Sequence, residues 1–173
     1  MSSTLSEQLS PYFLLGGYNA AELWPTIDVV GVSYALLVFT PRWKWTPALT
    51  LITPIFHSLI YVGSLFSILI EGGGMGDTDM NSFEGVVTFM KDPNVLFPAW
   101  IHYIAFDLLV SRMITIDSVD RGASNVFHIF AILPCIGLTL MFGPTGFLLY
   151  IILRQIFLPA TSASASGTKY KIL

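Results

Sequence analysis

The chain has little charge and almost no cysteine. Only 11% of its 173 residues are Asp, Glu, Lys or Arg, and Cys135 is the one cysteine. A single thiol excludes a disulfide framework within the chain and a zinc site built from thiolates. The formal net charge of −3 provides no basic surface, so we expect no nucleic-acid binding.

Familiar catalytic and metal-binding motifs are also missing. The sequence has no phosphate-binding loop, zinc signature or nucleophile elbow. Asp77 and Asp79 begin a stretch like a calcium-binding loop, but Ser82 replaces its turn glycine and Thr88 its bidentate glutamate. We therefore predict no metal site and no required cofactor, and we interpret residues 71–95 as a solvated acidic connection.

Apolar residues dominate what remains. They make up 54% of the chain, and the mean hydropathy is +0.71, as in integral membrane proteins. A helix needs about 20 apolar residues to cross the hydrocarbon core. We predict an all-α membrane protein, a four-transmembrane-helix bundle that forms one domain over residues 1–160, with a flexible tail over 161–173. The predicted spans are residues 23–40, 47–70, 97–116 and 126–158.

The last apolar stretch is too long for a straight crossing. As one helix, residues 126–158 would measure about 50 Å, and Pro134 and the run from Gly143 to Gly146 interrupt them. We predict a single tilted helix kinked at its Pro and Gly residues, with two half-helices as the alternative. The single span divides the Lys and Arg residues evenly between the two sides. A reversal at 143–146 would gather nearly all of them on one side.

Ionisable residues lie within the third span. His102, Asp107 and Arg112 occur there, and a charged group near the bilayer midplane is costly unless it is paired, neutralised or hydrated. At about 100° per residue, Trp100 and Tyr103 share a face with Asp107, whereas His102 and Arg112 each lie about 140° from it. Each ionisable group therefore needs a partner from another helix, a water pocket or a ligand.

The second span carries a polar stripe. Its members recur at helical spacing and are Thr50, Thr53, His57, Tyr61 and Ser64. Such a stripe faces protein, a ligand or water rather than lipid. It is compatible with hydrogen bonds between helices and equally with a catalytic or ligand-binding face.

These residues define a candidate site. The candidate catalytic residues are His102, Asp107 and His57, and the candidate ligand-binding residues are Trp100, Tyr103, Tyr61 and Arg112. An apolar surrounding favours a protonated Asp that can donate, and a neutral His can accept a proton. There are alternatives without catalysis: His102 bonds a backbone carbonyl or a lipid headgroup, Asp107 only holds its helix against neighbouring helices, and Arg112 reaches the membrane interface. His57 and His102 could also bind the central metal of a tetrapyrrole.

Longer motifs resemble a known family. The third span reads Phe97-x-Ala-Trp-Ile-His-x-x-x-x-Asp-Leu-x-x-x-Arg112, and Leu-Pro-Cys135 and Phe-Gly143-Pro-x-Gly follow it. Together with Pro41-Arg-Trp after the first span, these motifs are similar to the abscisic-acid-deficient-four-like family over about residues 24–157. The pattern of the third span is the most specific of them.

The resemblance implies a function in carotenoid metabolism. Plant members of the family are small four-helix plastid membrane proteins, in the thylakoid or envelope, required to make neoxanthin from violaxanthin. It thus implies xanthophyll epoxide isomerisation, or an essential accessory role, with His102 and Asp107 as acid and base and with Trp100 and Tyr103 along a polyene. The alternative is a non-catalytic scaffold subunit of a larger photosynthetic membrane complex, with bound carotenoid, chlorophyll or lipid and neighbouring subunits as partners.

Overall fold

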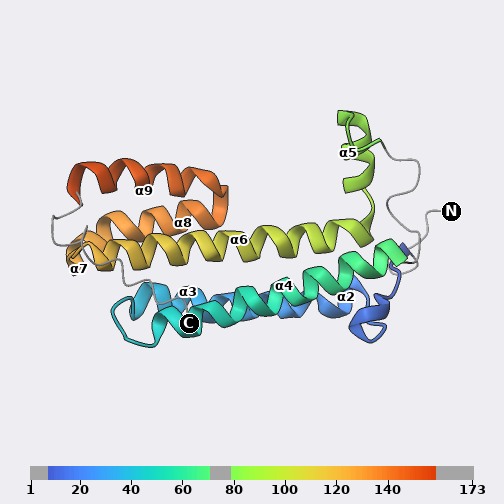
Figure 1. Cartoon of the computed structure of the whole chain (residues 1–173), viewed down its shortest axis with the longest axis horizontal. Helices are drawn as coiled ribbons and strands as arrows, with labels where there is room; N and C mark the ends of the chain where they lie inside the picture. The colour runs from blue at the N-terminus through green and yellow to red at the C-terminus, as the bar shows by residue number, and fades with distance from the viewer. Residues whose placement is uncertain (1–7, 71–78, 159–173) are drawn as a thin grey trace. The chain divides into compact units, whose positions relative to one another are not determined.

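The computed structural model describes residues 8–70 and 79–158. Within these ranges the secondary structure is helical, apart from one isolated bridge between Tyr12 and Tyr18. Contacts divide the chain into two compact units. Unit 1 consists of Met1–Val29 and Ile55–Ala105, and unit 2 of Val30–Pro54 and Phe106–Leu173. The two longest helices, α4 (Thr46–Ile70) and α6 (Pro93–Asp120), each contribute to both units (Figure 1).

The all-α membrane class is confirmed. Four described helical segments are long and apolar enough to cross a bilayer: Ala20–Phe39, Thr46–Ile70, Pro93–Asp120 and Asn125–Phe142. The first of them joins α2 (Ala20–Leu23), the 3-10 helix η2 (Trp24–Asp28) and α3 (Val29–Phe39). The single domain over 1–160 stays a prediction, and the tail over 161–173 lies outside the described residues.

The N-terminal part of unit 1 packs against the start of α6. A short 3-10 helix, η1 (Phe13–Leu15), precedes α2, whose N-terminus is closed by a capping box between Asn19 and Glu22. Tyr12 is buried and stacks on Phe97, with ring centroids 5.9 Å apart. Burial and the negative charge of Asp92 raise the pKa of the Tyr12 phenol, because both disfavour the phenolate.

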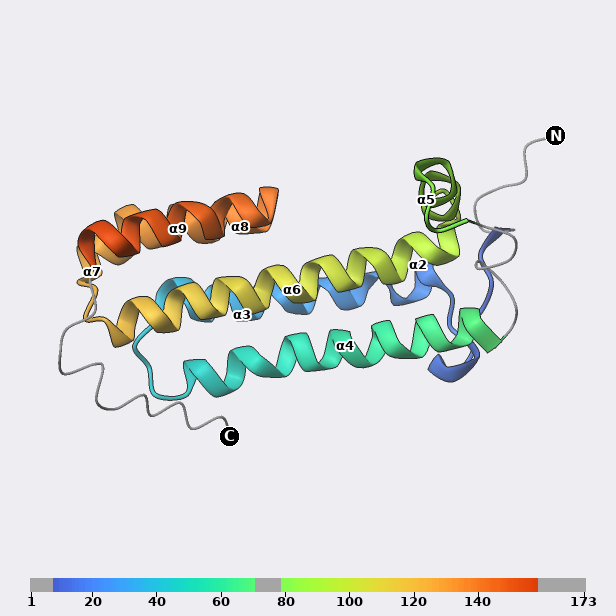
Figure 2. The same ribbon diagram turned by 45° about the horizontal axis from the view of Figure 1, so that its top comes forward.

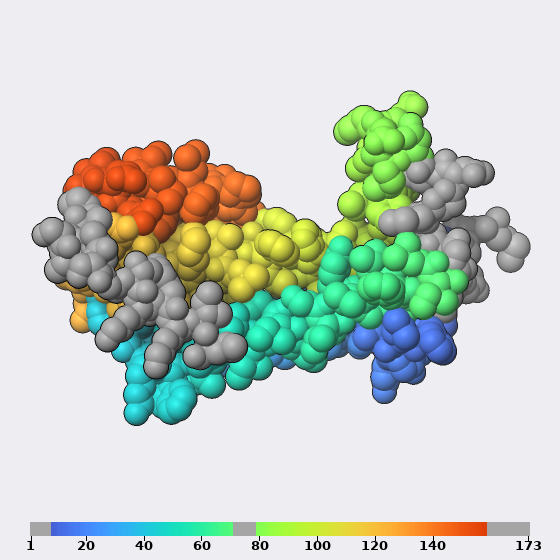
Figure 3. All heavy atoms as spheres, viewed as in Figure 1, coloured from blue at the N-terminus to red at the C-terminus, as the bar shows by residue number. Residues whose placement is uncertain are grey.

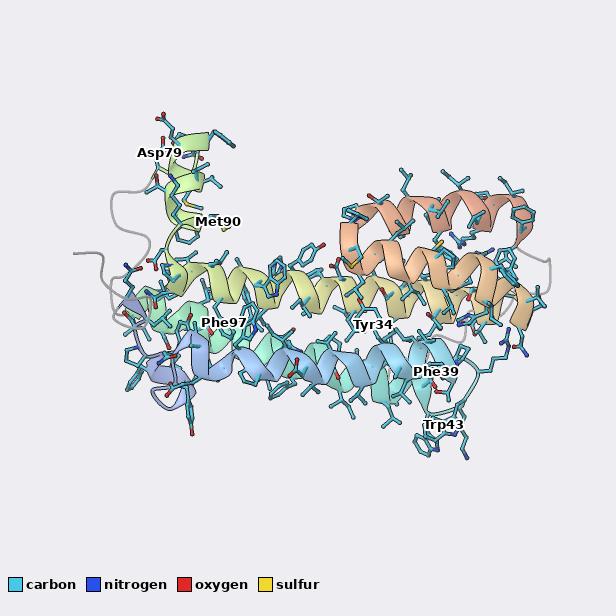
Figure 4. All side chains as sticks on the ribbon, turned by 180° about the vertical axis from the view of Figure 1, so that it is seen from behind. Tyr34, Phe39, Trp43, Asp79, Met90 and Phe97 are labelled. Atoms are coloured by element: carbon cyan, nitrogen blue, oxygen red, sulfur yellow. The ribbon has the colours of Figure 1, made fainter. Side chains whose placement is uncertain are left out.

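The acidic connection contains a helix that its composition conceals. In unit 1, α5 (Phe83–Met90) begins at Ser82, whose hydroxyl accepts a hydrogen bond from Gly85 N at 3.0 Å. A Cβ at Gly85 would lie 1.9 Å from Asp79 O, so the turn before α5 requires glycine there. Asp79 and Met90 are labelled on this segment in Figure 4. The connection therefore contains a helix where a loop was expected, although no residue of α5 is buried, and Asp77 lies outside the described residues.

Unit 2 is held by hydrogen bonds between polar side chains of its helices. Ser33 on α3 donates to Thr53 on α4 at 2.8 Å, and the Tyr34 and Ser111 hydroxyls lie 3.4 Å apart. Part of the predicted polar stripe thus joins helices rather than facing lipid. After α6 the chain continues through α7 (Asn125–Phe127), a π-helix η3 (His128–Ile132) and α8 (Leu133–Phe142).

The fourth span differs from the prediction. Instead of one kinked helix over 126–158, α8 ends at Phe142, and α9 (Pro144–Phe157) runs back along it, as both views show (Figures 1 and 2). Gly143 has φ +53°, a conformation that side chains other than glycine rarely adopt. At Gly146 an added Cβ would lie 2.2 Å from Cys135 O. These two glycines allow the reversal, and the kink is not confirmed.

An ion cluster joins the end of α9 to the end of α6. Arg121 Nε and Arg154 Nε lie 3.0 and 2.9 Å from Asp117 Oδ2, and the Tyr150 hydroxyl donates to the same oxygen. Arg121 Nη1 also donates to Leu158 O at 2.9 Å. The end of α9 therefore lies at the end of α6 that carries Arg121. Arg121 and Arg154 thus meet at the same end of unit 2.

Candidate functional site

Unit 1 contains an apolar pocket. It has a volume of about 160 Å³ and lies between the C-terminal half of α4, α5 and the first turns of α6. Apolar side chains form most of its wall, and Tyr61 and His102 add polar groups. For scale, a protein cavity of about 150 Å³ holds benzene. The pocket can therefore hold one six-membered ring.

Pro98 shapes the α6 side of the pocket. Because proline has no backbone N–H, Pro98 cannot bond Asn94 O, its partner four residues earlier in the helix. The Tyr12 hydroxyl donates to this carbonyl instead, at 2.8 Å. The Asn94 side-chain amide donates to Gln8 O at 3.0 Å. The N-terminal segment thus fixes the α6 turn that lines the pocket.

Tyr61 and His102, two of the predicted site residues, lie beside each other in this pocket. Their ring centroids lie 5.3 Å apart at an interplanar angle of 33°. Tyr61 is partly buried, and His102 is exposed on the surface of α6. An imidazole can accept or donate a proton near neutral pH. The pocket therefore combines a ring-sized apolar space with one acid/base group.

Trp100 and Tyr103 form a second aromatic pair on α6. Their ring centroids lie 5.7 Å apart, and their side chains are 44% and 36% exposed. In a membrane-spanning helix, exposed aromatic faces contact acyl chains or an apolar ligand. The pair therefore forms an aromatic surface on α6 against which a long apolar molecule can lie.

His57 makes a bond between helices. It is fully buried, and its Nε2 lies 3.1 Å from Thr26 O on η2. The bond requires the tautomer in which Nε2 carries the proton and donates. His57 therefore ties α4 to the first membrane segment within unit 1. Its catalytic role stays a prediction.

Asp107 and Arg112 belong to unit 2. Arg112 donates from Nε and Nη2 to Pro47 O at 3.1 and 2.9 Å, so its guanidinium connects α6 to the first turn of α4. Asp107 is 7% exposed. Neither residue is part of the pocket wall of unit 1. Across the described residues, no group of three or more His, Cys, Asp or Glu side chains is placed to hold a metal ion.

Sequence reasoning missed two polar positions in unit 2. Asp117 was not among the candidate residues, although its spacing of four from Arg121 already favours an ion pair. His128 was not singled out, and it is only 3% exposed. A histidine at the start of a long apolar run was the available signal. Tyr150 and Arg154 also contact Asp117. No local pattern in the sequence predicts these contacts, because both residues lie on α9, more than 30 residues after Asp117.

Comparison with known proteins gives one match. The family model described as ABA DEFICIENT 4-like matches residues 26–150, which include the third-span motif and the glycines of the α8–α9 turn. No curated protein and no solved structure matches the chain. The matched range covers most of the chain and agrees with the motifs quoted from its sequence. The chain is therefore an integral membrane protein of the ABA DEFICIENT 4-like family.

Proposed function

We propose that this protein acts in neoxanthin synthesis as a xanthophyll epoxide isomerase, with the pocket of unit 1 as the site for an epoxidised ring. Membership of the ABA DEFICIENT 4-like family supports the pathway. The position of an imidazole beside a ring-sized apolar pocket in a membrane helix is the observation that carries the proposal. A plastid membrane, thylakoid or envelope, is the compartment that holds such a substrate.

The reaction is a proton transfer coupled to bond reorganisation. A base removes the vinylic proton beside the epoxide, and the released electron pair forms the second double bond of an allene. The carbon–oxygen bond of the epoxide opens at the adjacent carbon, and the oxygen takes up a proton to become a hydroxyl. The product is an isomer of the substrate, so no oxidant, reductant or metal is needed to balance the step.

The pocket provides residues of the required chemical types. His102 is the proposed base, because it is the imidazole of the pocket. Tyr61 carries a hydroxyl in the same pocket and is one candidate donor to the epoxide oxygen. Asp107, the donor expected from the sequence, belongs to unit 2 and does not line this pocket. The volume accepts the ring end alone, so the polyene would lie outside it, against Trp100 and Tyr103.

Turnover of violaxanthin by the purified full-length protein tests the proposal. The protein in lipid nanodiscs is incubated with violaxanthin, and the products are separated chromatographically. We expect neoxanthin to form and His102→Gln to lower its rate by about 10²–10⁴-fold, the range for losing a general base. Lys44→Gln, which changes an exposed residue of unit 2 outside both cavities, is the control and should retain the rate. An unchanged rate in His102→Gln would remove the proposed base.

Two further variants assign the proton donor. Tyr61→Phe removes only a hydroxyl, and Asp107→Asn removes only the ability to act as a carboxylic acid. If Tyr61 donates, Tyr61→Phe loses the conversion and Asp107→Asn keeps it. The opposite result would contradict Tyr61 as the donor. If both variants keep the wild-type rate, neither residue is the donor.

A pigment-binding scaffold is the second candidate function. The observation that favours it is that His57 and Arg112, two of the predicted site residues, both bond backbone carbonyls. Such bonds hold helices together and need no substrate. The same nanodisc experiment separates the two functions: tight retention of violaxanthin without conversion supports the scaffold and contradicts the isomerase.

A further inference from the structure

Unit 2 contains a second, larger concavity, which the proposed function does not use. This open groove has a volume of about 910 Å³ and lies between the end of α3, the loop that follows it, and the segment from α7 to the first residue of α8. Its polar lining includes Arg42, Asn125 and His128, and its apolar lining includes Val38, Ile129 and Leu133. No Asp or Glu occurs among the described residues that line it.

The groove lies at the level of the membrane boundary. Its two sides are formed where the first membrane segment ends, at Phe39, and where the fourth begins, at Asn125. Figure 4 labels Phe39 and Trp43 at this end of α3. Phe39 is 81% exposed, and Trp43 is a residue type that concentrates at membrane interfaces. One end of the groove is therefore at headgroup depth, and its apolar wall continues along the spans.

Arg42 is held in place at the polar end of the groove. Its Nη1 donates to the Asn125 side-chain oxygen and its Nη2 to Ala123 O. A guanidinium has five N–H donors in a planar fork. Two of these N–H donors are used in the bonds to Asn125 and Ala123, and the other three remain for a ligand. The two bonds also fix the position of the guanidinium. A fixed guanidinium is suited to a phosphate, which it can bind through two parallel hydrogen bonds.

His128 supplies an independent indication of a ligand. The side chain is 3% exposed and lines the groove. The backbone carbonyls of Leu37 and Val38 act on its ring as weak hydrogen-bond acceptors, but within the described residues neither ring nitrogen has a partner at the distance and angle of a normal hydrogen bond. A buried imidazole without such partners loses free energy that a bound polar group would restore. His128 also begins the π-helix η3, and π-turns of this kind often occur at functional sites.

Pro134 offers a structural reason for the same π-turn. It lacks a backbone N–H, and its ring crowds the carbonyl four residues earlier, so the helix before it widens. That reason explains the backbone, but it does not explain why a histidine occupies the first position of the π-helix. An apolar residue there would line an apolar helix at no cost in desolvation.

From these observations we propose that the groove of unit 2 binds one anionic membrane lipid, whose phosphate contacts Arg42 and His128 and whose acyl chain lies along Val38, Ile129 and Leu133. The charge of Arg42, the lack of carboxylates in the lining and the position at the end of the spans favour an acidic lipid. The site is separate from the pocket of unit 1, so the proposal does not depend on the isomerase.

Lipid retention by the full-length protein tests this site. The protein is reconstituted in nanodiscs with equal amounts of phosphatidylglycerol and phosphatidylcholine, released into mild detergent, and analysed by native mass spectrometry. We expect each protein to retain one phosphatidylglycerol molecule and to prefer it over phosphatidylcholine by about tenfold or more. A preference of this size corresponds to one additional charge-assisted hydrogen bond to the anionic lipid. Arg42→Gln and His128→Phe should each remove this preference. Equal retention of both lipids by the wild type would overturn the proposal.

Lys44→Gln is the matched control for charge. Lys44 lies in the same loop, two residues after Arg42, but its ammonium sits 5.6 Å from the centroid of the Trp45 ring and is not part of the groove. It should keep the lipid preference, whereas an equal loss in Lys44→Gln would show that only the charge of the loop matters.

Ile129→Trp and inorganic phosphate separate the remaining explanations. Ile129 is 54% exposed in the groove, so tryptophan can fill the acyl-chain path without touching the Arg42 bonds. It should lower phosphatidylglycerol retention while helicity and thermal stability stay normal, and unchanged retention would contradict the proposed path. Millimolar inorganic phosphate should not displace the lipid. Displacement of the lipid by phosphate would identify a phosphate site rather than a lipid site. Retention of xanthophyll in place of phosphatidylglycerol would identify a pigment site.

Discussion

At the scale of single residues, polar side chains in this protein mostly satisfy backbone carbonyls. Tyr12 takes the carbonyl that Pro98 leaves without its helical partner, His57 bonds Thr26 O, and Arg112 donates twice to Pro47 O. In an apolar surrounding an unpaired backbone group costs several kcal/mol. Polar residues of a membrane helix can therefore be required for packing alone, and a histidine in a span is not by itself evidence of catalysis.

His57 and His102 should consequently respond differently to substitution. We expect His57→Leu to lower the free energy of unfolding by about 1–3 kcal/mol, because Thr26 O loses its buried donor. Thermal unfolding of the detergent-solubilised protein measures this change. Violaxanthin conversion per folded molecule should stay near the wild-type level, which is the reverse of the result expected for His102→Gln. A lost conversion in folded His57→Leu would support the catalytic role predicted for His57.

At the scale of elements, the α8–α9 hairpin depends on two glycines and one ion cluster. Gly143 provides the positive φ of the turn, and Gly146 allows α9 to approach the α8 backbone. Figure 3 shows the outer surface of α9, whose exposed apolar side chains include Leu148, Ile152 and Ile156. Asp117 then joins the far end of the hairpin to α6 through Arg121, Tyr150 and Arg154. The Phe-Gly-Pro-x-Gly motif is therefore explained by the turn and does not require a role in chemistry.

Substitution at Gly146 tests the hairpin. A Cβ there would lie 2.2 and 2.3 Å from Cys135 O and Thr139 N, both backbone atoms that cannot move aside independently. We expect Gly146→Ala to destabilise the protein by about 1–3 kcal/mol or more through overpacking. Gly137→Ala, also on α8, is the control. With nothing described within 4 Å of the added Cβ, it should be neutral or stabilising by up to about 1 kcal/mol.

Thermal unfolding of both variants in the same detergent is the measurement. Lower stability in Gly146→Ala and not in Gly137→Ala would support the close approach of α9 to α8. Equal effects of the two substitutions would show that α9 does not lie where the structure places it.

At the scale of the whole molecule, the reversal at Gly143 changes the membrane topology. The end of α9 returns to the end of α6 that carries Asp117 and Arg121. Helix α9 has 14 residues, so at about 1.5 Å per residue it is too short to cross the hydrocarbon core on its own. After the turn at Gly143, α9 can run back to the side of the membrane at which α8 began. Arg154 then lies on the same side of the membrane as Arg121. This agrees with the preference of cations for one side of a membrane.

Labelling of single cysteines tests this topology. In a Cys135→Ala background, Asp120→Cys at the end of α6 and Gln155→Cys near the end of α9 should react with an impermeant thiol reagent from the same side of sealed, uniformly oriented vesicles. Lys91→Cys, before the opposite end of α6, should react only from the other side. A Gln155→Cys that reacts together with Lys91→Cys would mean that residues 125–157 cross the membrane as one span.

The sequence by itself determined the membrane class, the first three spans and the family. Hydropathy is a sum over consecutive residues, and the third-span motif is local, so neither needs tertiary contacts. It named Tyr61 and His102 as candidate site residues, and the structure places both in the pocket of unit 1. The tertiary structure decided the reversal at Gly143, the bonds that occupy His57 and Arg112, and the positions of Asp117 and His128. Each depends on atoms from distant parts of the chain, such as Asp117 and Arg154, and no local pattern specifies that such atoms meet.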